Sequence, residues 1–133
     1  MLIGKGLQKP GGGGGGPWNY FDNAYWVNSS NFTWSGSQWD ENVFASGQAE
    51  IQETGTWASG FRPSSVDINY TFSGGSHQLR VIDSNAAVIG TANVSGTGTA
   101  NITLTFTTYD ISKIRLSMTS VNTGSITDIW FNS

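Results

Sequence analysis

The sequence predicts an all-β protein, an antiparallel β-sandwich preceded by an extended glycine-rich arm. Its 133 residues are rich in Ser, Thr, Val, Ile and aromatic types, which suit a half-buried pleated surface. Several short segments alternate apolar and polar residues with a period of two, as strands with one buried face do. Turn-forming residues separate these segments at intervals of roughly 8–12 residues, a spacing typical of sandwiches.

The arm is expected to comprise residues 1–17, and the folded domain residues 18–133. Six consecutive glycines at positions 11–16 supply no side chain to a core, so we interpret them as a tether. The arm has three apolar anchors that we expect to bind a partner subunit: Leu2, Ile3 and Leu7. The domain that follows is long enough to bury one hydrophobic core.

An aromatic-rich stretch follows the tether, and we expect short strands in it at 24–28, 31–35 and 39–46. Its first aromatics are predicted to seat the base of the arm, either on the domain's own edge or on a partner subunit: Trp18, Tyr20 and Phe21. Four tryptophans are candidates to stack on sugar rings: Trp26, Trp34, Trp39 and Trp57. A sandwich of this size also needs large core residues, so we favour a core or subunit-interface role for these four.

The later strands are predicted at 48–54, 66–72, 77–83, 88–94, 100–106, 111–118 and 126–131, with a short strand at 57–60. Alternation assigns several polar side chains to the face opposite the core: Gln48, Glu50, Gln52, Arg80, Lys113 and Arg115. In the last strand, Ile126, Asp128 and Trp130 are expected to share one face.

Composition excludes several classes of function. A net charge of −3, with six Lys and Arg residues thinly spread, leaves no basic stripe for nucleic acid. The absence of cysteine rules out disulfides and thiolate metal sites. No run approaches the ~20 apolar residues that a membrane helix needs, and the N-terminus lacks a hydrophobic signal core.

The order of segments from 40 to 132 resembles the jelly-roll modules of the carbohydrate-binding and galactose-binding-like type. The likeness begins with a long strand at 66–72 that leads to a Gly-rich turn. It continues with a strand and turn at 79–85, followed by the segment Val88-Ile89-Gly90. It continues with a Gly/Thr-rich loop before 102–106 and with 110–116 leading to a closing strand at 126–129. Such modules are found in secreted glycan-degrading enzymes and in phage virion proteins. The resemblance therefore implies a jelly roll that either binds carbohydrate or assembles with other virion subunits.

The resemblance also implies a structural calcium tied to the closing strand, where this sequence has Asp128. Further oxygen ligands would come from backbone carbonyls or from Asp22 or Asp40. The alternative, which we favour, is an ordinary solvated or turn-facing Asp128. No other cofactor is expected.

The sequence has few candidate catalytic residues, and we expect that the protein is not an enzyme. His77 is the single histidine, is expected at the surface, and has no partners in triad order. Glu50 and Glu53 are predicted on opposite faces of a strand, and the Asp40-Glu41 pair in a loop. Neither pair suits glycosidase chemistry, which needs two carboxylates flanking one bond.

We therefore interpret the chain as a non-enzymatic virion structural protein on the outside of a phage particle, as capsid decoration or a tail component. The arm would anchor it to neighbouring subunits, in a homo-oligomer or on other capsid or tail proteins. The alternative is an extracellular carbohydrate-binding module or adhesin that recognises glycans through surface Trp and Tyr residues. An accessory fragment of a glycan-active enzyme is disfavoured, because a catalytic pair is missing and the chain ends after the last strand.

Overall fold

The structure is a computed structural model that describes residues 17–41, 47–54, 62–73, 77–106, 109–118 and 124–132. The side chains at 29, 30, 47 and 116–118 are not described. The arm at 1–16, the predicted strand at 57–60 and Trp57 thus lie outside the described residues. No helix in the described part is long and apolar enough to span a membrane.

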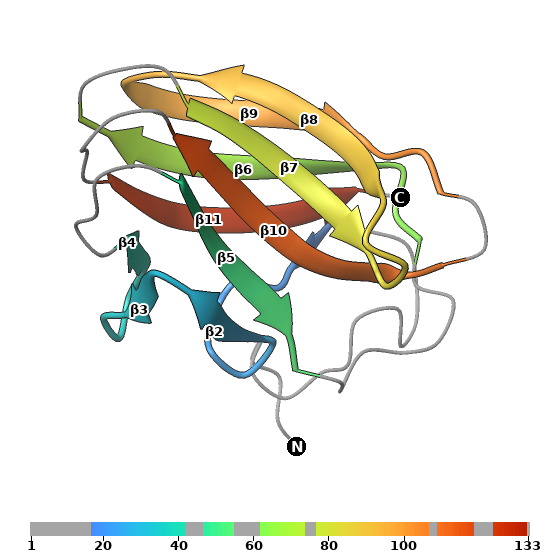
Figure 1. Cartoon of the computed structure of the whole chain (residues 1–133), viewed down its shortest axis with the longest axis horizontal. Coiled ribbons are helices and arrows are strands. Elements are labelled where there is room, and N and C mark those ends of the chain that lie inside the picture. Colours follow the sequence, from blue (N-terminus) through green and yellow to red (C-terminus); the bar gives the residue numbers. More distant parts are fainter. Residues whose placement is uncertain are drawn as a thin grey trace.

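The described residues form two antiparallel sheets, as the sequence predicts (Figure 1). Sheet A has the order β3-β4-β11-β6-β9, and β1 also pairs with β11. Its strands are β1 (Trp18–Asn19), β3 (Phe32–Trp34), β4 (Trp39–Glu41), β6 (Ser65–Phe72), β9 (Thr97–Thr103) and β11 (Gly124–Asn132). Sheet B has the order β2-β5-β10-β7-β8. Its strands are β2 (Trp26–Ser30), β5 (Gly47–Glu53), β7 (His77–Asp83), β8 (Val88–Val94) and β10 (Ile111–Met118).

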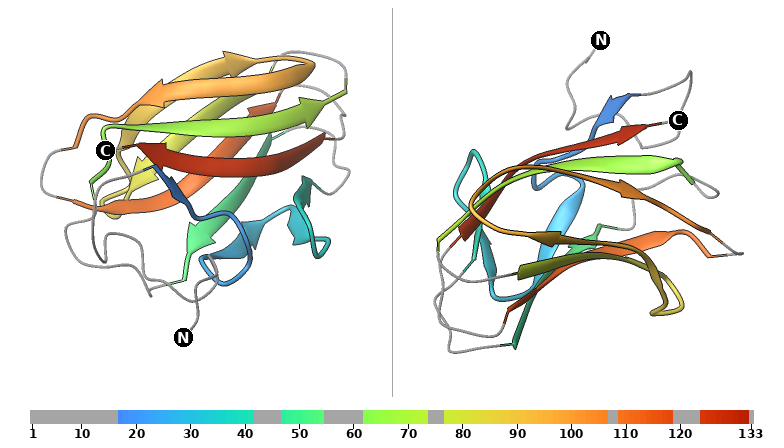
Figure 2. Two further views of the ribbon diagram at one scale, coloured as in Figure 1. Left: turned by 180° about the vertical axis from the view of Figure 1, so that it is seen from behind. Right: turned by 90° about the horizontal axis from the view of Figure 1, so that it is seen from above.

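Among the described strands, the chain stays in one sheet from β3 to β4 and from β7 to β8, and it crosses to the other sheet at every other connection. Seen edge-on, the two sheets form two layers (Figure 2). The core lies between them because each strand turns its apolar alternation inward. Val66, Ile68 and Ile129 of sheet A and Ile51 and Ile114 of sheet B are all fully buried.

Two differences from the predicted strands concern their ends. The strand expected at 100–106 is β9, which ends at Thr103, and the one expected at 39–46 is described only as β4. Asp40 and Glu41 therefore lie in a strand and not in a loop, because they pair with Thr33 and Phe32 of β3. The short strand β1 was not predicted, since two residues carry no alternation signal.

A β-bulge in β11 corrects the expected facing of the last strand. The pairing with β6 shifts between Ile126 and Asp128, which inserts one extra residue. Ile126, Ile129 and Phe131 are consequently fully buried, while Trp130 is 38% exposed. Ile126 therefore faces the core, whereas Asp128 and Trp130 lie on the outer face.

Candidate functional site

The predicted aromatic platform is not built from Trp26 and Trp39. These side chains are 0% and 2% exposed, so neither offers a ring face to a sugar. Each indole N–H donates to a backbone carbonyl, Trp26 to Tyr20 (2.8 Å) and Trp39 to Phe21 (3.1 Å). Trp34 is half-buried, with its ring centroid 5.3 Å from that of Trp39. Trp26 and Trp39 are therefore core residues, and Trp34 packs against that core.

The aromatics after the tether pack on their own domain. Trp18 of β1 pairs with Phe131 of β11, and its ring is partly buried against the core. Tyr20 and Phe21 are 2% and 3% exposed. Tyr20 and Phe21 are thus core residues of their own domain, while Leu2, Ile3 and Leu7 lie outside the described residues.

The residues considered for calcium are not brought together. Asp128 accepts hydrogen bonds from Asn19 (2.7 Å) and from the indole of Trp130 (2.9 Å). Asp22 accepts from the backbone N–H of Ala24, and Asp40 from Gln38 and Ser125. Within the described ranges, no three Asp, Glu or His side chains gather as a metal cluster.

His77 is a correction to the expected surface histidine. It is 2% exposed, and its ring stacks on Phe72 at a centroid distance of 4.7 Å. The reason is its position as the first residue of β7, where its side chain follows the inward alternation of Leu79 and Val81. It is therefore a core residue.

The outer face of sheet B gathers the strongest set of polar groups, and it is the face turned to the viewer in Figure 1. Pairing aligns three rows of residues across β5, β10 and β7. The central row is Glu50, Arg115 and Arg80, and one flanking row is Gln52, Lys113 and Ile82. On the other side of the central row, the backbone of residue 117 pairs with Gln48 and with Gln78. We call six of these residues the basic face: Glu50, Gln52, Gln78, Arg80, Lys113 and Arg115.

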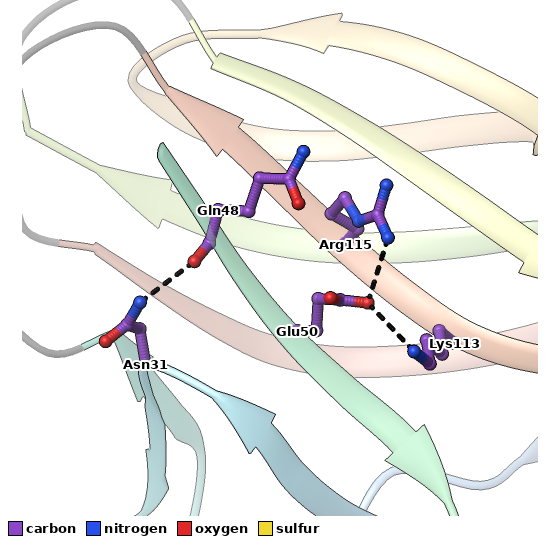
Figure 3. A network of polar contacts seen from close by, with 5 residues as sticks. All are labelled: Asn31, Gln48, Glu50, Lys113 and Arg115. Carbon is purple, nitrogen blue, oxygen red and sulfur yellow. Dashed lines mark hydrogen bonds and ion pairs between the residues drawn. The ribbon is translucent and has the colours of Figure 1, made fainter. Parts of the chain in front are cut away.

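Ion pairs fix the centre of the basic face (Figure 3). One carboxylate oxygen of Glu50 lies 3.3 Å from a guanidinium nitrogen of Arg115 and 3.6 Å from Nζ of Lys113. The Glu50 side chain is 11% exposed, while Arg115 and Lys113 are 23% and 30% exposed. The two cations therefore neutralise a nearly buried carboxylate and remain within reach of a ligand.

Positive charge on this face exceeds what Glu50 neutralises. Arg80 and Arg115 are direct cross-strand partners, an arrangement that like charges normally disfavour. Nε of Arg80 donates to the amide oxygen of Gln78 (2.6 Å), whereas the buried Nε of Arg115 has no hydrogen-bond partner among the described residues. The ion pairs seen for these cations among the described residues are those of Lys113 and Arg115 with Glu50.

The outer face of sheet A has the opposite charge. Asp67 accepts hydrogen bonds from Asn101 (2.6 Å) and Asn132 (3.2 Å). Asp40 and Asp128 lie on the same face, and among the described residues no Lys or Arg joins them there, since Arg62 pairs with Asp110. The left view of Figure 2 shows the molecule from behind, so that sheet A faces the viewer, with β9, β6, β11 and β1 in front.

The comparisons with known proteins concern the fold. No protein-family model and no curated protein matches the chain. A variant of the family 29 carbohydrate-binding module CBM29-2 superimposes with a TM-score of 0.62 and 16% identity, over 86% of this chain and 89% of that chain. A further CBM29-2 variant, complexed with mannohexaose, gives a TM-score of 0.61 and 17% identity over 85% of this chain and 88% of that one. Another family 29 module gives 0.60 and 16%, over 85% of each chain.

At this level of identity the likeness shows the fold, a carbohydrate-binding-module type of β-sandwich. It fits the carbohydrate-binding alternative and gives no support to a virion role. Alternation predicted the outward direction of the basic-face residues other than Gln78, but it did not predict that β5, β10 and β7 are neighbours. That adjacency comes from pairing between strands far apart in the sequence, for which a short-range pattern carries no signal.

Proposed function

We propose that this protein is a non-catalytic carbohydrate-binding module whose ligand lies across the basic face. The observation that carries the proposal is the set of carboxylate, amide, ammonium and guanidinium groups aligned on one face of sheet B. Sugar hydroxyls donate and accept hydrogen bonds, and these side chains supply both kinds of partner. The family 29 modules of the same fold support the proposal, one of them as a mannohexaose complex.

Pre-orientation favours binding by this face. The ion pairs of Glu50 with Arg115 and Lys113, and the bond of Arg80 to Gln78, hold long side chains that would otherwise lose rotamer freedom on binding. Strands hold neighbouring rows at fixed spacing, so the polar groups form a regular array. A chain of repeating sugar units is the kind of ligand that such an array suits.

Charge favours acidic glycans among these ligands. Three cations share this face with one carboxylate, in a protein whose net charge is −3. A uronate carboxylate or a sulfate ester between Arg80 and Arg115 would relieve their mutual repulsion and accept bidentate hydrogen bonds from a guanidinium. The proposed ligand class is therefore a polysaccharide that carries carboxylate or sulfate groups.

Calorimetric titration with polygalacturonate, a sulfated galactan and neutral glucomannan would test both carbohydrate binding and the preference for acidic glycans. We expect binding to at least one acidic polymer, and a roughly tenfold loss with Arg80→Gln, about 1.4 kcal/mol. Arg62→Gln is the matched control, because it removes an exposed arginine that pairs with Asp110 away from the face. Binding to neutral polymer alone would contradict the charge argument and leave the carbohydrate function standing. Absence of binding to all three polymers, or full affinity in the Arg80 variant, would contradict the proposed site.

A further inference from the structure

The outer face of sheet A, which the left view of Figure 2 turns to the viewer, carries an exposed tryptophan. Trp130 of β11 is 38% exposed and is the most exposed of the tryptophans that the structure describes. Its indole N–H donates to Oδ2 of Asp128 (2.9 Å). Because that bond engages the only polar atom of the ring and fixes its orientation, the ring offers its carbon surface to a ligand. A fixed apolar ring of this kind can pack against the C–H groups of a sugar.

Polar side chains flank the ring on both sides. Strand pairing places Asp67 of β6 and Asn19 of β1 directly opposite Trp130, and it places Asn101 of β9 directly opposite Asp67. Neighbouring strands lie about 4.8 Å apart, so a sugar stacked on Trp130 would have the Asp67 carboxylate within reach of its hydroxyls. Asp67 supplies acceptors and Asn101 supplies both donors and an acceptor, which are the partners that hydroxyl groups need.

Hydrogen bonds hold these polar groups in place without a ligand. Oδ1 of Asp67 accepts from the amide of Asn101 (2.6 Å), and its Oδ2 accepts from the amide of Asn132 (3.2 Å). The amide of Asn19 donates to Oδ1 of Asp128 (2.7 Å), so the carboxylate that orients the indole is itself oriented. Each oxygen of Asp67 keeps a second lone pair, and each of these amides keeps a second N–H. Side chains that are already ordered lose little rotamer freedom on binding, which favours affinity.

The charge of this face disfavours acidic ligands. The carboxylates nearest the ring are Asp67 and Asp128, and within the described ranges no Lys or Arg lies on the outer face of sheet A. The next row across the sheet is uncharged, and there the hydroxyl of Thr99 donates to Oδ1 of Asn69 (2.8 Å). A uronate or sulfate group would be repelled here, whereas neutral hydroxyl groups find donors and acceptors.

We propose that the outer face of sheet A is a second glycan-binding site, in which Trp130 stacks on a sugar ring of a neutral polysaccharide and Asp67 and Asn101 bind its hydroxyls. The site uses no residue of the basic face and does not depend on acidic-glycan binding there. Trp130 is also none of the tryptophans that the sequence suggested for stacking. The two faces of the sandwich would thus bind glycans of different charge.

NMR titration of the full chain with neutral hexasaccharides of mannose, glucose, xylose and galactose tests this site. At least one of them should shift the indole Nε1–H signal of Trp130, which Trp130→Phe assigns, together with the side-chain amide signals of Asn101. The Nε–H signal of Arg80, on the basic face, should stay in place. Trp130→Ala should weaken the binding about tenfold. Tyr109→Ala is the matched control, because it removes an exposed aromatic ring outside sheet A and should retain the wild-type affinity.

Asp67→Ala is a second variant, which removes the hydroxyl-binding carboxylate and should weaken binding about fivefold. Thermal unfolding of each variant verifies that it is folded. Absence of binding to all four hexasaccharides, or full affinity in folded Trp130→Ala, would overturn the proposal. A dimer that Trp130→Ala dissociates, without binding to any hexasaccharide, would assign the face to a second copy of the chain and would overturn it as well. Binding of polygalacturonate and its loss in Arg80→Gln are separate readouts, so either glycan site can fail alone.

Discussion

Glu41 and Glu50 are two nearly buried carboxylates in opposite circumstances. Glu50 has Arg115 and Lys113 within 3.6 Å, whereas Glu41 has no partner among the described residues. A buried charge without a partner is costly, while a paired one can be retained. Glu50 can therefore keep its charge beside Arg115 and Lys113, whereas burial raises the pKa of Glu41 to about 7.

The pH dependence of stability should report on Glu41. Its pKa is about 7 in the folded chain and about 4.5 in the unfolded one, so the folded state holds the proton more tightly. The free energy of unfolding should therefore be highest below pH 4.5 and fall by up to about 3 kcal/mol as the pH rises through 7.

Urea unfolding followed by tryptophan fluorescence between pH 4 and 8 measures this effect. Glu41→Gln should flatten the profile, because the titrating group is gone. Glu53→Gln, which removes a half-exposed carboxylate at the end of β5, should leave the wild-type slope unchanged. A wild-type profile without a fall between pH 5 and 7 would contradict the assignment.

Single residues were predicted well where alternation decides their direction, and poorly where it does not. The outward Arg80 and Lys113 follow from a period of two along their strands. Trp39 could not be assigned from its residue type, because tryptophan occurs in cores and on surfaces alike. His77 is in phase with Leu79 and Val81, so alternation would have placed it inward, and the expectation of a surface histidine overlooked this. Glu41 could not be found at all, since its burial depends on β3 and β11, which the local sequence does not specify.

At the scale of elements, the approach of β8 to β9 closes one edge of the sandwich. The backbone N–H of Thr105 donates to the carbonyl of Ile89 (2.9 Å), which brings the two sheets together there. Gly90 lies at this point, and a Cβ on it would sit 2.6 Å from Cγ2 of Ile102 and 2.7 Å from the carbonyl oxygen of Thr103. Only a residue without a side chain permits this approach.

Gly90→Ala should therefore destabilise the domain by about 1–3 kcal/mol, measured by chemical denaturation, because it overpacks a rigid contact. Gly98→Ala on β9 is the matched control, since its Cβ would meet the mobile hydroxyl end of Tyr70 at 3.1 Å. Its loss of stability should be clearly smaller. Equal stability of Gly90→Ala and the wild type would show that the two sheets are not in close contact at this edge.

The bulge in β11 shows why a strand can be predicted correctly while the faces to which its side chains point are predicted wrongly. The segment 126–131 was predicted as a strand, and it forms part of β11. Strict alternation nevertheless assigned Ile126 and Trp130 to one face, while the extra residue before Asp128 separates them. A bulge is stabilised by the partner strand, so its position is not encoded in the strand's own pattern.

At the scale of the whole molecule, the described core begins with Tyr20 and ends with Phe131. Deletion of residues 2–16 should therefore leave the thermal unfolding midpoint within a few degrees of the wild-type value. Extending the deletion through Phe21 removes strand β1 and two buried rings, and it should lower the midpoint sharply. A large loss from the shorter deletion would contradict the predicted boundary between arm and domain.

The two outer faces differ in charge, and this difference gives the folded domain an electric dipole across its thickness. Sheet B carries Arg80, Lys113 and Arg115 outward, while sheet A carries Asp40, Asp67 and Asp128. Near an anionic polymer or matrix, the domain would rotate before contact so that sheet B leads. Its far side would then repel a second strand of the same polymer. The fold would thus coat an acidic glycan in a single orientation and would not cross-link neighbouring chains.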